Sequence, residues 1–523
     1  MRGRTQSLTA LARLGFEDLT AGAERLAAVV DLLGVDEDAC VEVARHAADP
    51  DQALALLQDV AERDLDRVAA LVREPTGAAA LGRLLGASRG LGQFFERHPD
   101  ELELLRAGPV PPATAGEYRE RMLEAIEGRG HGGLDDAEAA WPALRTRYRR
   151  LLAQIALYDL SAADAVDVLD RVAAGLADLA GATLDAALEL ARRAHSRREG
   201  DPAAPARFPE ASVAATRLAV IGMGKAGARE LNYVSDVDVI FVAESSDEEV
   251  VSAPVAIDIA TRLAMSMMRA LNGASIEPPL WEVDPNLRPE GKDGALVRTL
   301  ESHLTYYDRW AKSWEFQALL KARPMAGDLE LGGRYVAGVA PKVWASASRE
   351  NFVESVQKMR ERVTEFIPDD EVDVQLKLGP GGLRDIEFTV QLLQLVHGQS
   401  DDTVHQRGTV AALDALDREE CIKAWRTLFG RETPKYVSVQ FMRRALAYEA
   451  QAKAQGGHSP VVRRALERSL KNVRKSNGKA KSALPASSLT LRPGTHLVRE
   501  WNGRSYQVEV VEDGFLMDGK RYR

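Results

Sequence analysis

Two aspartates one residue apart follow a glycine-rich stretch near the middle of the chain. The stretch Gly222-Met-Gly-Lys-Ala-Gly227 comes directly after the apolar run 218–221, and Asp236-Val-Asp238 opens a second apolar run. Because side chains alternate along a strand, both aspartates are expected on one face. Two carboxylates so placed repel each other unless a cation lies between them. Mg²⁺ or Mn²⁺, which bind carboxylates together with phosphate oxygens, suit such a pair.

The glycines in front of these aspartates suit a phosphate. Gly222, Gly224 and Gly227 let backbone N–H groups approach an anion closely, and Lys225 and Arg229 add positive charge. We therefore predict phosphate binding beside a metal. The alternative is a solvated turn in front of a strand, which explains one aspartate better than two.

The same glycines also match G-x-G-x-x-G, and Glu244 lies at the end of the next strand pattern. Such a pattern is a fingerprint of dinucleotide-binding folds. A parallel crossover, however, needs a dozen or more residues including its helix. Only about nine residues separate Gly227 from the second strand pattern. We therefore predict that this is not a dinucleotide-binding fold.

The elements around this motif predict an α+β protein. Apolar residues recur at helical spacing before it, which indicates a helical N-terminal region over 1–198. Three short strand patterns at 218–221, 238–242 and 281–284 predict a core with a β-sheet over 214–300. Helical periodicity returns over 301–416 and predicts a helical domain or bundle.

Composition sets the class of protein. The chain has 523 residues, of which 45% are hydrophobic and 28% charged, which excludes disordered and collagen-like chains. Its two cysteines, Cys40 and Cys421, exclude a disulfide framework and a cysteine-rich zinc site. It has neither a run of 18 apolar residues nor a signal-peptide pattern. We therefore expect a cytoplasmic protein.

The last 107 residues have a different character. Residues 417–523 contain 22 Lys and Arg against 11 Asp and Glu, a net charge of +11, so the first 416 residues carry −21 of the total of −10. Residues 417–470 are predicted to be a basic helical segment, and 489–523 a small β-meander with a hairpin turn at Asn502-Gly503. This tail is either a nucleic-acid-binding surface or a solvated basic surface.

Five ordered blocks of the body resemble the glutamine synthetase adenylyltransferase/adenylyl-removing enzyme family, which belongs to the polymerase-β-like nucleotidyltransferase superfamily. The blocks are Gly222–Asp238, Val283–Gly291, Tyr306–Glu315, Lys321–Pro324 and Lys377–Phe388. The resemblance covers about residues 1–416. It implies a polymerase-β-like mixed sheet in the predicted core.

The resemblance also implies a third carboxylate on a neighbouring strand, for which Asp284 is the candidate. Asp236, Asp238 and Asp284 would then be both the catalytic residues and the ligands of Mg²⁺ (or Mn²⁺). The alternative for Asp284 is an ion pair with Arg288. The further candidates for nucleotide or phosphate contact carry positive charge or lie in a glycine-rich turn: Arg288, Lys321, Arg323, Lys377, Gly381, Gly382 and Arg384. Each of the basic ones is alternatively a surface or ion-pair residue.

The activity that the resemblance implies is an AMP transfer. Family enzymes have two catalytic halves, of which the N-terminal half removes AMP from a tyrosine of glutamine synthetase by phosphorolysis and the C-terminal half attaches it. This chain opens with a helical region and resembles the removing half, with phosphate as co-substrate and ADP as product. The alternative is addition of AMP from ATP. The implied partners are glutamine synthetase and a PII-type signal protein.

The tail resembles a different, uncharacterised domain family found near phage and mobile-element recombinases. The resemblance is carried by Ala424–Gly430, Arg443–Tyr448, the stretch from Arg499–Arg504 through Gly514, and Asp518–Tyr522. It places a seam near Leu416 and indicates a gene fusion. A fusion product with a nucleic-acid-binding tail and little or no enzyme activity is therefore the third hypothesis.

Overall fold

The computed structural model describes residues 8–197, 208–349, 374–379 and 381–415, some single residues up to Tyr448, and four strands between His496 and Tyr522. The chain divides into two compact units, Met1–Gln451 and Ala452–Arg523. Most of the predicted basic segment 417–470 lies outside the described residues. Within the described ranges, no helix is long and apolar enough to cross a membrane.

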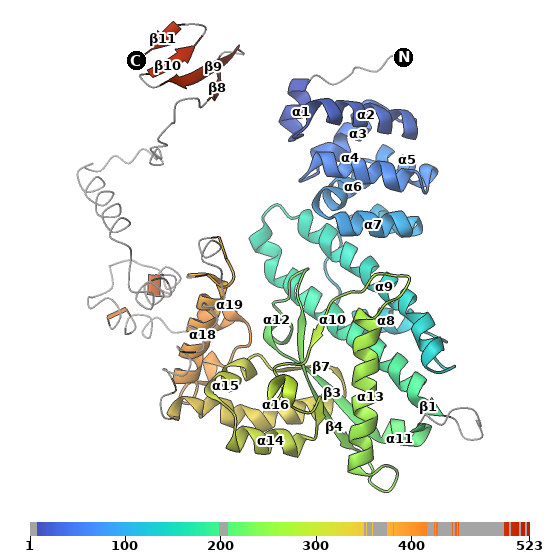
Figure 1. Cartoon of the computed structure of the whole chain (residues 1–523), viewed down its shortest axis with the longest axis vertical. Coiled ribbons are helices and arrows are strands. Elements are labelled where there is room, and N and C mark those ends of the chain that lie inside the picture. Colours follow the sequence, from blue (N-terminus) through green and yellow to red (C-terminus); the bar gives the residue numbers. More distant parts are fainter. Residues whose placement is uncertain are drawn as a thin grey trace. The chain divides into compact units, whose positions relative to one another are not determined.

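The first unit begins with short helices that share one hydrophobic core, and we call residues 8–107 the N-terminal array (Figure 1). Asp18, Asp49 and Asp64 each accept hydrogen bonds from the first backbone N–H groups of a helix, which fixes where that helix begins. The elements are α1 (Leu8–Leu14), α2 (Leu19–Leu33), α3 (Glu37–Arg45), α4 (Pro50–Ala61), α5 (Leu65–Arg73), α6 (Pro75–Ala87), α7 (Arg89–Arg97) and the 3₁₀ helix η1 (Pro99–Ala107).

Three further helices connect the array to the sheet. They are α8 (Ala115–Glu124), α9 (Leu134–Leu160) and α10 (Ala165–His195). Ala153, Ala156 and Leu157 of α9 belong to the core of the array, whereas Leu144, Leu151 and Ile155 face the core under the sheet. Helix α9 therefore joins the two cores.

The mixed sheet has the strand order β5-β4-β3-β7, and β6 also pairs with β4. Strand β3 (Thr216–Gly222) runs antiparallel to β4 (Val237–Ser245) and to β7 (Arg323–Gly327), whereas β5 (Val283–Asp284) and β6 (Val297–Arg298) run parallel to β4. The α+β prediction is confirmed. The antiparallel β3–β4 pair also rules out the dinucleotide-binding fold, which needs these strands parallel.

Helices cover both faces of the sheet (Figure 1). Alternate residues of β3 and β4 face opposite ways, so Val220 and Phe241 pack with α9, α10 and α13 (Ala253–Asn272). Ile221 and Ile240 pack on the other side with α14 (Leu300–Arg309), α15 (Ser313–Leu319) and α16 (Leu329–Trp344). Beyond them lie α18 (Leu383–His397), the 3₁₀ turn η4 (Asp402–Val404) and α19 (Thr409–Ala415).

Strand β7 lies in a region where the sequence analysis expects helices. It is short, lies at the edge of the sheet and contains Pro324 where its pairing with β3 shifts register. Proline lacks an N–H group and is tolerated at such an edge irregularity. A strand of this kind has no alternating pattern by which the sequence would reveal it.

The second unit contains a four-stranded antiparallel sheet in the order β11-β10-β9-β8. Its strands are β8 (His496–Trp501), β9 (Arg504–Val511), β10 (Gly514–Met517) and β11 (Lys520–Tyr522). The predicted meander is present, with the Asn502-Gly503 pair between β8 and β9. Strand β11 is an addition to the prediction, which ended the meander one strand earlier.

Candidate active site

The predicted catalytic aspartates meet where β4 and β5 lie side by side. Asp238 pairs with Asp284 in the parallel register of these strands, and exposed Asp236 directly precedes β4. Burial raises the pKa of Asp238 to about 6, helped by the negative charges of Asp284 and Asp236. The negative charges of Asp236 and Asp284 therefore both act on Asp238.

The glycine-rich stretch contacts this group directly. Gly224 begins the five-residue helix α12 (Gly224–Ala228) with a φ of +49°, and a Cβ atom there would lie 2.4 Å from Oδ2 of Asp238. The N–H of Met223 donates to the carbonyl oxygen of Asp238 at 2.9 Å. Only a residue without a side chain brings the backbone this close to the carboxylate.

Gly227 is equally constrained. A Cβ atom there would lie 2.0 Å from the backbone oxygen of Lys321 and 2.4 Å from that of Gly222. The glycine therefore allows three backbone segments to converge behind α12.

The donor set of this site suits a hard divalent cation. Carboxylate oxygens are the ligands that Mg²⁺ and Mn²⁺ prefer, and Gly224 places no side chain against Oδ2 of Asp238. Across the ranges that the structure describes, no three His, Cys, Asp or Glu side chains are already arranged to hold a metal ion. Mg²⁺ fits these conditions because it takes one or two carboxylates and completes its shell with water and phosphate oxygens.

Two basic residues that lie far from Asp238 in the sequence, Lys377 and Arg384, act on it electrostatically. Lys377 and Arg384 both lower the pKa of Asp238, against the larger effect of burial. The pKa of Lys225 is lowered by burial and then by the charge of Lys377, and its Nζ donates to Oδ1 of Asn232 at 3.1 Å. These three basic residues therefore belong to one electrostatic neighbourhood with the carboxylates.

The turn that carries Arg384 is ordered by its own aspartate. Gly381 has a φ of +78°, and its N–H donates to Oδ2 of Asp385 at 2.8 Å. Gly382 follows as the residue before α18. The N–H group of Gly381, a predicted phosphate contact, thus already has a protein acceptor, Asp385.

Two other predicted phosphate contacts, Arg229 and Arg323, donate to protein groups. Arg229 pairs with Asp178 of α10 at 2.5 Å and 3.2 Å. Arg323 donates to the carbonyl oxygens of Ala226 and Gly227 at the end of α12.

Arg288 holds the loop that follows β5. Its guanidinium donates to the carbonyl oxygens of Pro285, Lys292 and Gly294. Asp284 instead accepts from the N–H of Asn286 at 2.8 Å, and its charge raises the pKa of Arg288 against the larger lowering by burial. Arg288 therefore shapes the loop beside Asp284.

Lys321 is buried in a cluster that the sequence did not reveal. Its Nζ lies 3.3 Å from Glu230 after α12, 3.3 Å from Glu387 of α18 and 3.4 Å from Thr409 of α19. Glu230 in turn accepts from the backbone and the hydroxyl of Thr409. We call these residues the Lys321 cluster; it ties α18 and α19 to the glycine-rich stretch. In the sequence, only the position of Glu230 three residues after Gly227 could have indicated that it belongs near the site.

Family models match three parts of the chain. Residues 78–337 match glutamate-ammonia ligase adenylyltransferase, residues 350–432 match GlnD PII-uridylyltransferase, and residues 407–523 match a protein family of unknown function, DUF2924. The first match contains the sheet and all three candidate aspartates. The third contains the four-stranded sheet of the second unit.

Curated relatives match the body of the chain. A bifunctional glutamine synthetase adenylyltransferase/adenylyl-removing enzyme of Leifsonia xyli is 55% identical over 426 residues, which is 82% of this chain and 41% of that protein. The enzyme of the same name from Streptomyces coelicolor is 48% identical over 423 residues, 79% of this chain and 39% of its own length. The chain thus spans about two fifths of the length of these relatives. By these matches, the body of this chain belongs to the glutamate-ammonia ligase adenylyltransferase family of nucleotidyltransferases and is followed by a DUF2924 region.

Proposed function

We propose that this protein transfers AMP at a tyrosine of glutamine synthetase, and that it works in the removing direction. The observation that carries the proposal is the pairing of Asp238 with Asp284 on adjacent strands, with Gly224 packed against Asp238. This places carboxylates beside a backbone loop that has no side chain to block a phosphate. The names of the relatives supply the substrate.

In the proposed reaction, an oxygen of inorganic phosphate attacks the phosphorus of the AMP group. The bond from phosphorus to the tyrosyl oxygen breaks, so that ADP and unmodified tyrosine are formed, and the tyrosyl oxygen takes a proton. Lys225, Lys377 and Arg384 bring positive charge to the same place and are suited to hold the phosphate oxygens in line.

Asp236, Asp238 and Asp284 would hold Mg²⁺ or Mn²⁺, which supplies positive charge for the phosphate oxygens. The protein residues determine the rest of the arrangement. The Lys321 cluster and Arg323 keep the glycine-rich stretch in place from behind, since both bond to α12 or to the residues that follow it. The site is thus built for positioning and charge neutralisation, which dominate catalysis of phosphoryl transfer.

The removing direction is supported by the order of elements. In the resemblance, the removing half follows a helical N-terminal region, and this chain has the N-terminal array, α8, α9 and α10 before its sheet. The relatives carry both activities in their names, so the direction requires a direct test.

The test uses the purified full chain with Mg²⁺. One reaction contains adenylylated glutamine synthetase and phosphate and is analysed for ADP; the other contains unmodified glutamine synthetase and ATP and is analysed for protein-bound AMP and pyrophosphate. ADP in the first reaction alone supports the proposal. AMP incorporation in the second alone reverses the direction, and no product in either reaction refutes the enzymatic assignment.

We also propose a PII-type signal protein as a partner of residues 350–432. The family model matched there carries PII in its name. Titration of the full chain with a purified PII protein by calorimetry tests this. Absence of heat at micromolar concentrations, with and without ATP, contradicts the proposal.

A further inference from the structure

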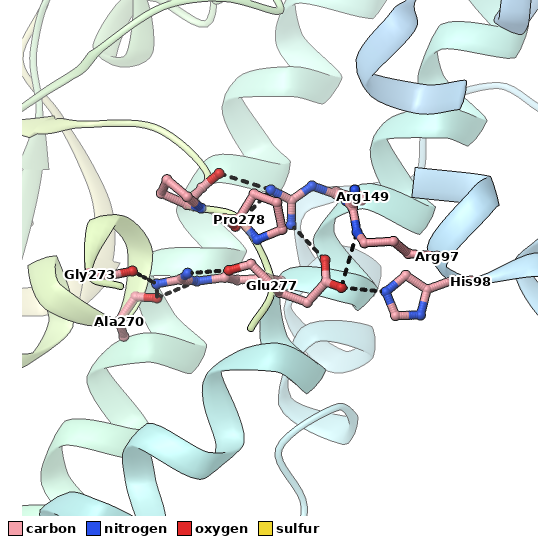
Figure 2. Close-up of polar contacts among 9 residues, drawn as sticks. Arg97, His98, Arg149, Ala270, Gly273, Glu277 and Pro278 are labelled. Carbon is pink, nitrogen blue, oxygen red and sulfur yellow. Dashed lines mark hydrogen bonds and ion pairs between the residues drawn. The ribbon is translucent and has the colours of Figure 1, made fainter. Parts of the chain in front are cut away.

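A buried glutamate lies on the connection between α13 and β5. Glu277 is only 4% exposed, although it carries a charge. Its carboxylate lies 2.6 Å from Nε2 of His98 and 3.4 Å from Nε of Arg97, which are at the end of α7, and 3.5 Å from Nη1 of Arg149 on α9 (Figure 2). The side chain of Glu277, between α13 and β5, is therefore held by the N-terminal array and by α9 together.

The backbone of the same connection is held by two arginines of α9. Fully buried Arg145 donates to the carbonyl oxygens of Ala270, Gly273 and Glu277 at 2.7–3.1 Å. Arg149 donates to those of Pro278 and Pro279, both at 2.8 Å. These contacts satisfy the carbonyl groups at the end of α13 and immobilise residues 273–279.

Backbone hydrogen bonds restrain the chain between this connection and Asp284, the candidate metal ligand. The N–H of Leu280 donates to Leu271 at 2.9 Å, and the carbonyl oxygen of Glu282 accepts from Val237 at 2.9 Å. The next two residues form β5, where Asp284 pairs with Asp238. A displacement of Glu277 is therefore passed through a few restrained residues to Asp284.

We propose that Glu277 is a positioning residue that sets the place of Asp284 by tying the α13–β5 connection to the N-terminal array. This inference depends on the proposed function in one respect, since it takes Asp284 as a metal ligand. Removing the negative charge leaves Arg97, His98 and Arg149 facing one another around a buried point, which favours their separation. Groups that bond directly to metal ligands typically contribute about 10- to 100-fold to metal affinity, and Glu277, which acts through the intervening chain, should lie at the lower end of that range.

The chain offers a matched control for a merely structural role. Arg150 of α9 pairs with Glu101 of η1, so this pair also joins α9 to the N-terminal array. Its two side chains do not bond to residues 273–282 in any contact that the structure gives. If Glu277 served only to attach the array, Glu277→Gln and Glu101→Gln would affect the site alike.

The experiment measures Mn²⁺ binding to the full chain without substrate, by the electron paramagnetic resonance signal of free Mn²⁺. We expect Glu277→Gln to weaken binding about tenfold, as Asp284→Asn does, and Glu101→Gln to bind within about twofold of the unchanged protein. The double variant Glu277→Gln/Asp284→Asn should be no weaker than Asp284→Asn, because both changes act on one ligand. Equal binding by Glu277→Gln and the unchanged protein overturns the proposal.

Thermal unfolding and circular dichroism accompany each variant. If Glu277→Gln does not fold, His98→Asn replaces it, because that change removes one of three partners and leaves both arginines. Weaker Mn²⁺ binding by His98→Asn then supports the proposal, and unchanged binding overturns it. If the unchanged protein binds Mn²⁺ but transfers no AMP, the proposed function fails while the positioning role is still decided by these binding data.

Discussion

Asp238 and Asp284 lie directly opposite each other on two parallel strands, and Asp284 raises the pKa of Asp238. The glycine-rich stretch approaches the same carboxylate, so that Gly224 has no room for a side chain. Repulsion between the carboxylates is unfavourable in the isolated protein, and the divalent cation that we propose would relieve it. Like charges held this close together are typical of a functional site.

Neutralising Asp284 therefore tests catalysis apart from folding. We expect Asp284→Asn to lower the rate of AMP transfer by roughly 100-fold or more, the scale on which single electrostatic elements act in such sites. The folded state should keep its stability, because the change removes a repulsion. Glu282→Gln, an exposed neighbour, is the control and should keep its rate. A wild-type rate in Asp284→Asn would remove Asp284 from the site.

We expect a Gly→Ala substitution to have opposite effects on stability at Gly227 and at Gly333. Gly227→Ala places a Cβ atom 2.0 Å from a backbone oxygen, so we expect a loss of about 1–3 kcal/mol in the free energy of unfolding. Gly333 is exposed within α16 and has no atom within 4 Å of an added Cβ. Gly333→Ala should therefore stabilise the protein by about 0.5–1 kcal/mol. Urea denaturation measures both, and a stabilised Gly227→Ala variant would contradict the packing described.

The Lys321 cluster is expected to stabilise the fold. Lys321→Met leaves Glu230 and Glu387 without their shared cation, and we expect a loss of about 2 kcal/mol, less than for fully buried pairs because both glutamates retain some exposure. The control is Lys342→Met, since Lys342 pairs with the exposed Asp308 and should contribute less than about 1 kcal/mol. Equal unfolding free energies for the two variants would show that the cluster is not a stabilising contact.

His303 predicts an acid sensitivity of the fold. It is buried, stacks with Tyr307, meets Tyr335 edge-on, and donates one hydrogen bond from Nε2 to the carbonyl oxygen of Phe241; burial lowers its pKa from 6.5 to about 4. The unfolded chain therefore binds the proton first as the pH falls. Stability contributed by neutral His303 is present above pH 6.5 and is lost as the pH falls from 6.5 toward 4.

The comparison variant is His303→Phe, which keeps the aromatic packing and cannot titrate. The free energy of unfolding of the unchanged protein should fall relative to this variant by up to about 1.4 kcal/mol per pH unit within that window. Urea denaturation at pH 7, 6, 5 and 4.5 measures the difference. Parallel curves for the two proteins would show that His303 is not held neutral by the fold.

Local patterns predicted much of the core correctly. The runs 218–221 and 238–242 became β3 and β4, and the short spacing between them correctly excluded a parallel crossover. The turn at Asn502-Gly503 likewise predicted the β8–β9 hairpin. These features depend on neighbours in the chain, so that alternation, length and turn chemistry suffice to reveal them. Strand β7, Arg323–Gly327, shows no alternation of apolar and polar residues, and strand β11 has only three residues.

The sequence by itself thus determined the glycine-rich stretch, its aspartates and the two strands on either side of them, β3 and β4, because each depends on residues close together in the chain. Only the tertiary structure decided the partners of the charged residues. Arg229 meets Asp178, Lys321 meets Glu387 and Glu277 meets His98, each across a long stretch of sequence. A basic residue near a phosphate motif has the same type and spacing whether it faces a ligand or a buried carboxylate. What distinguishes the two cases is the packing of distant helices, which no local pattern records.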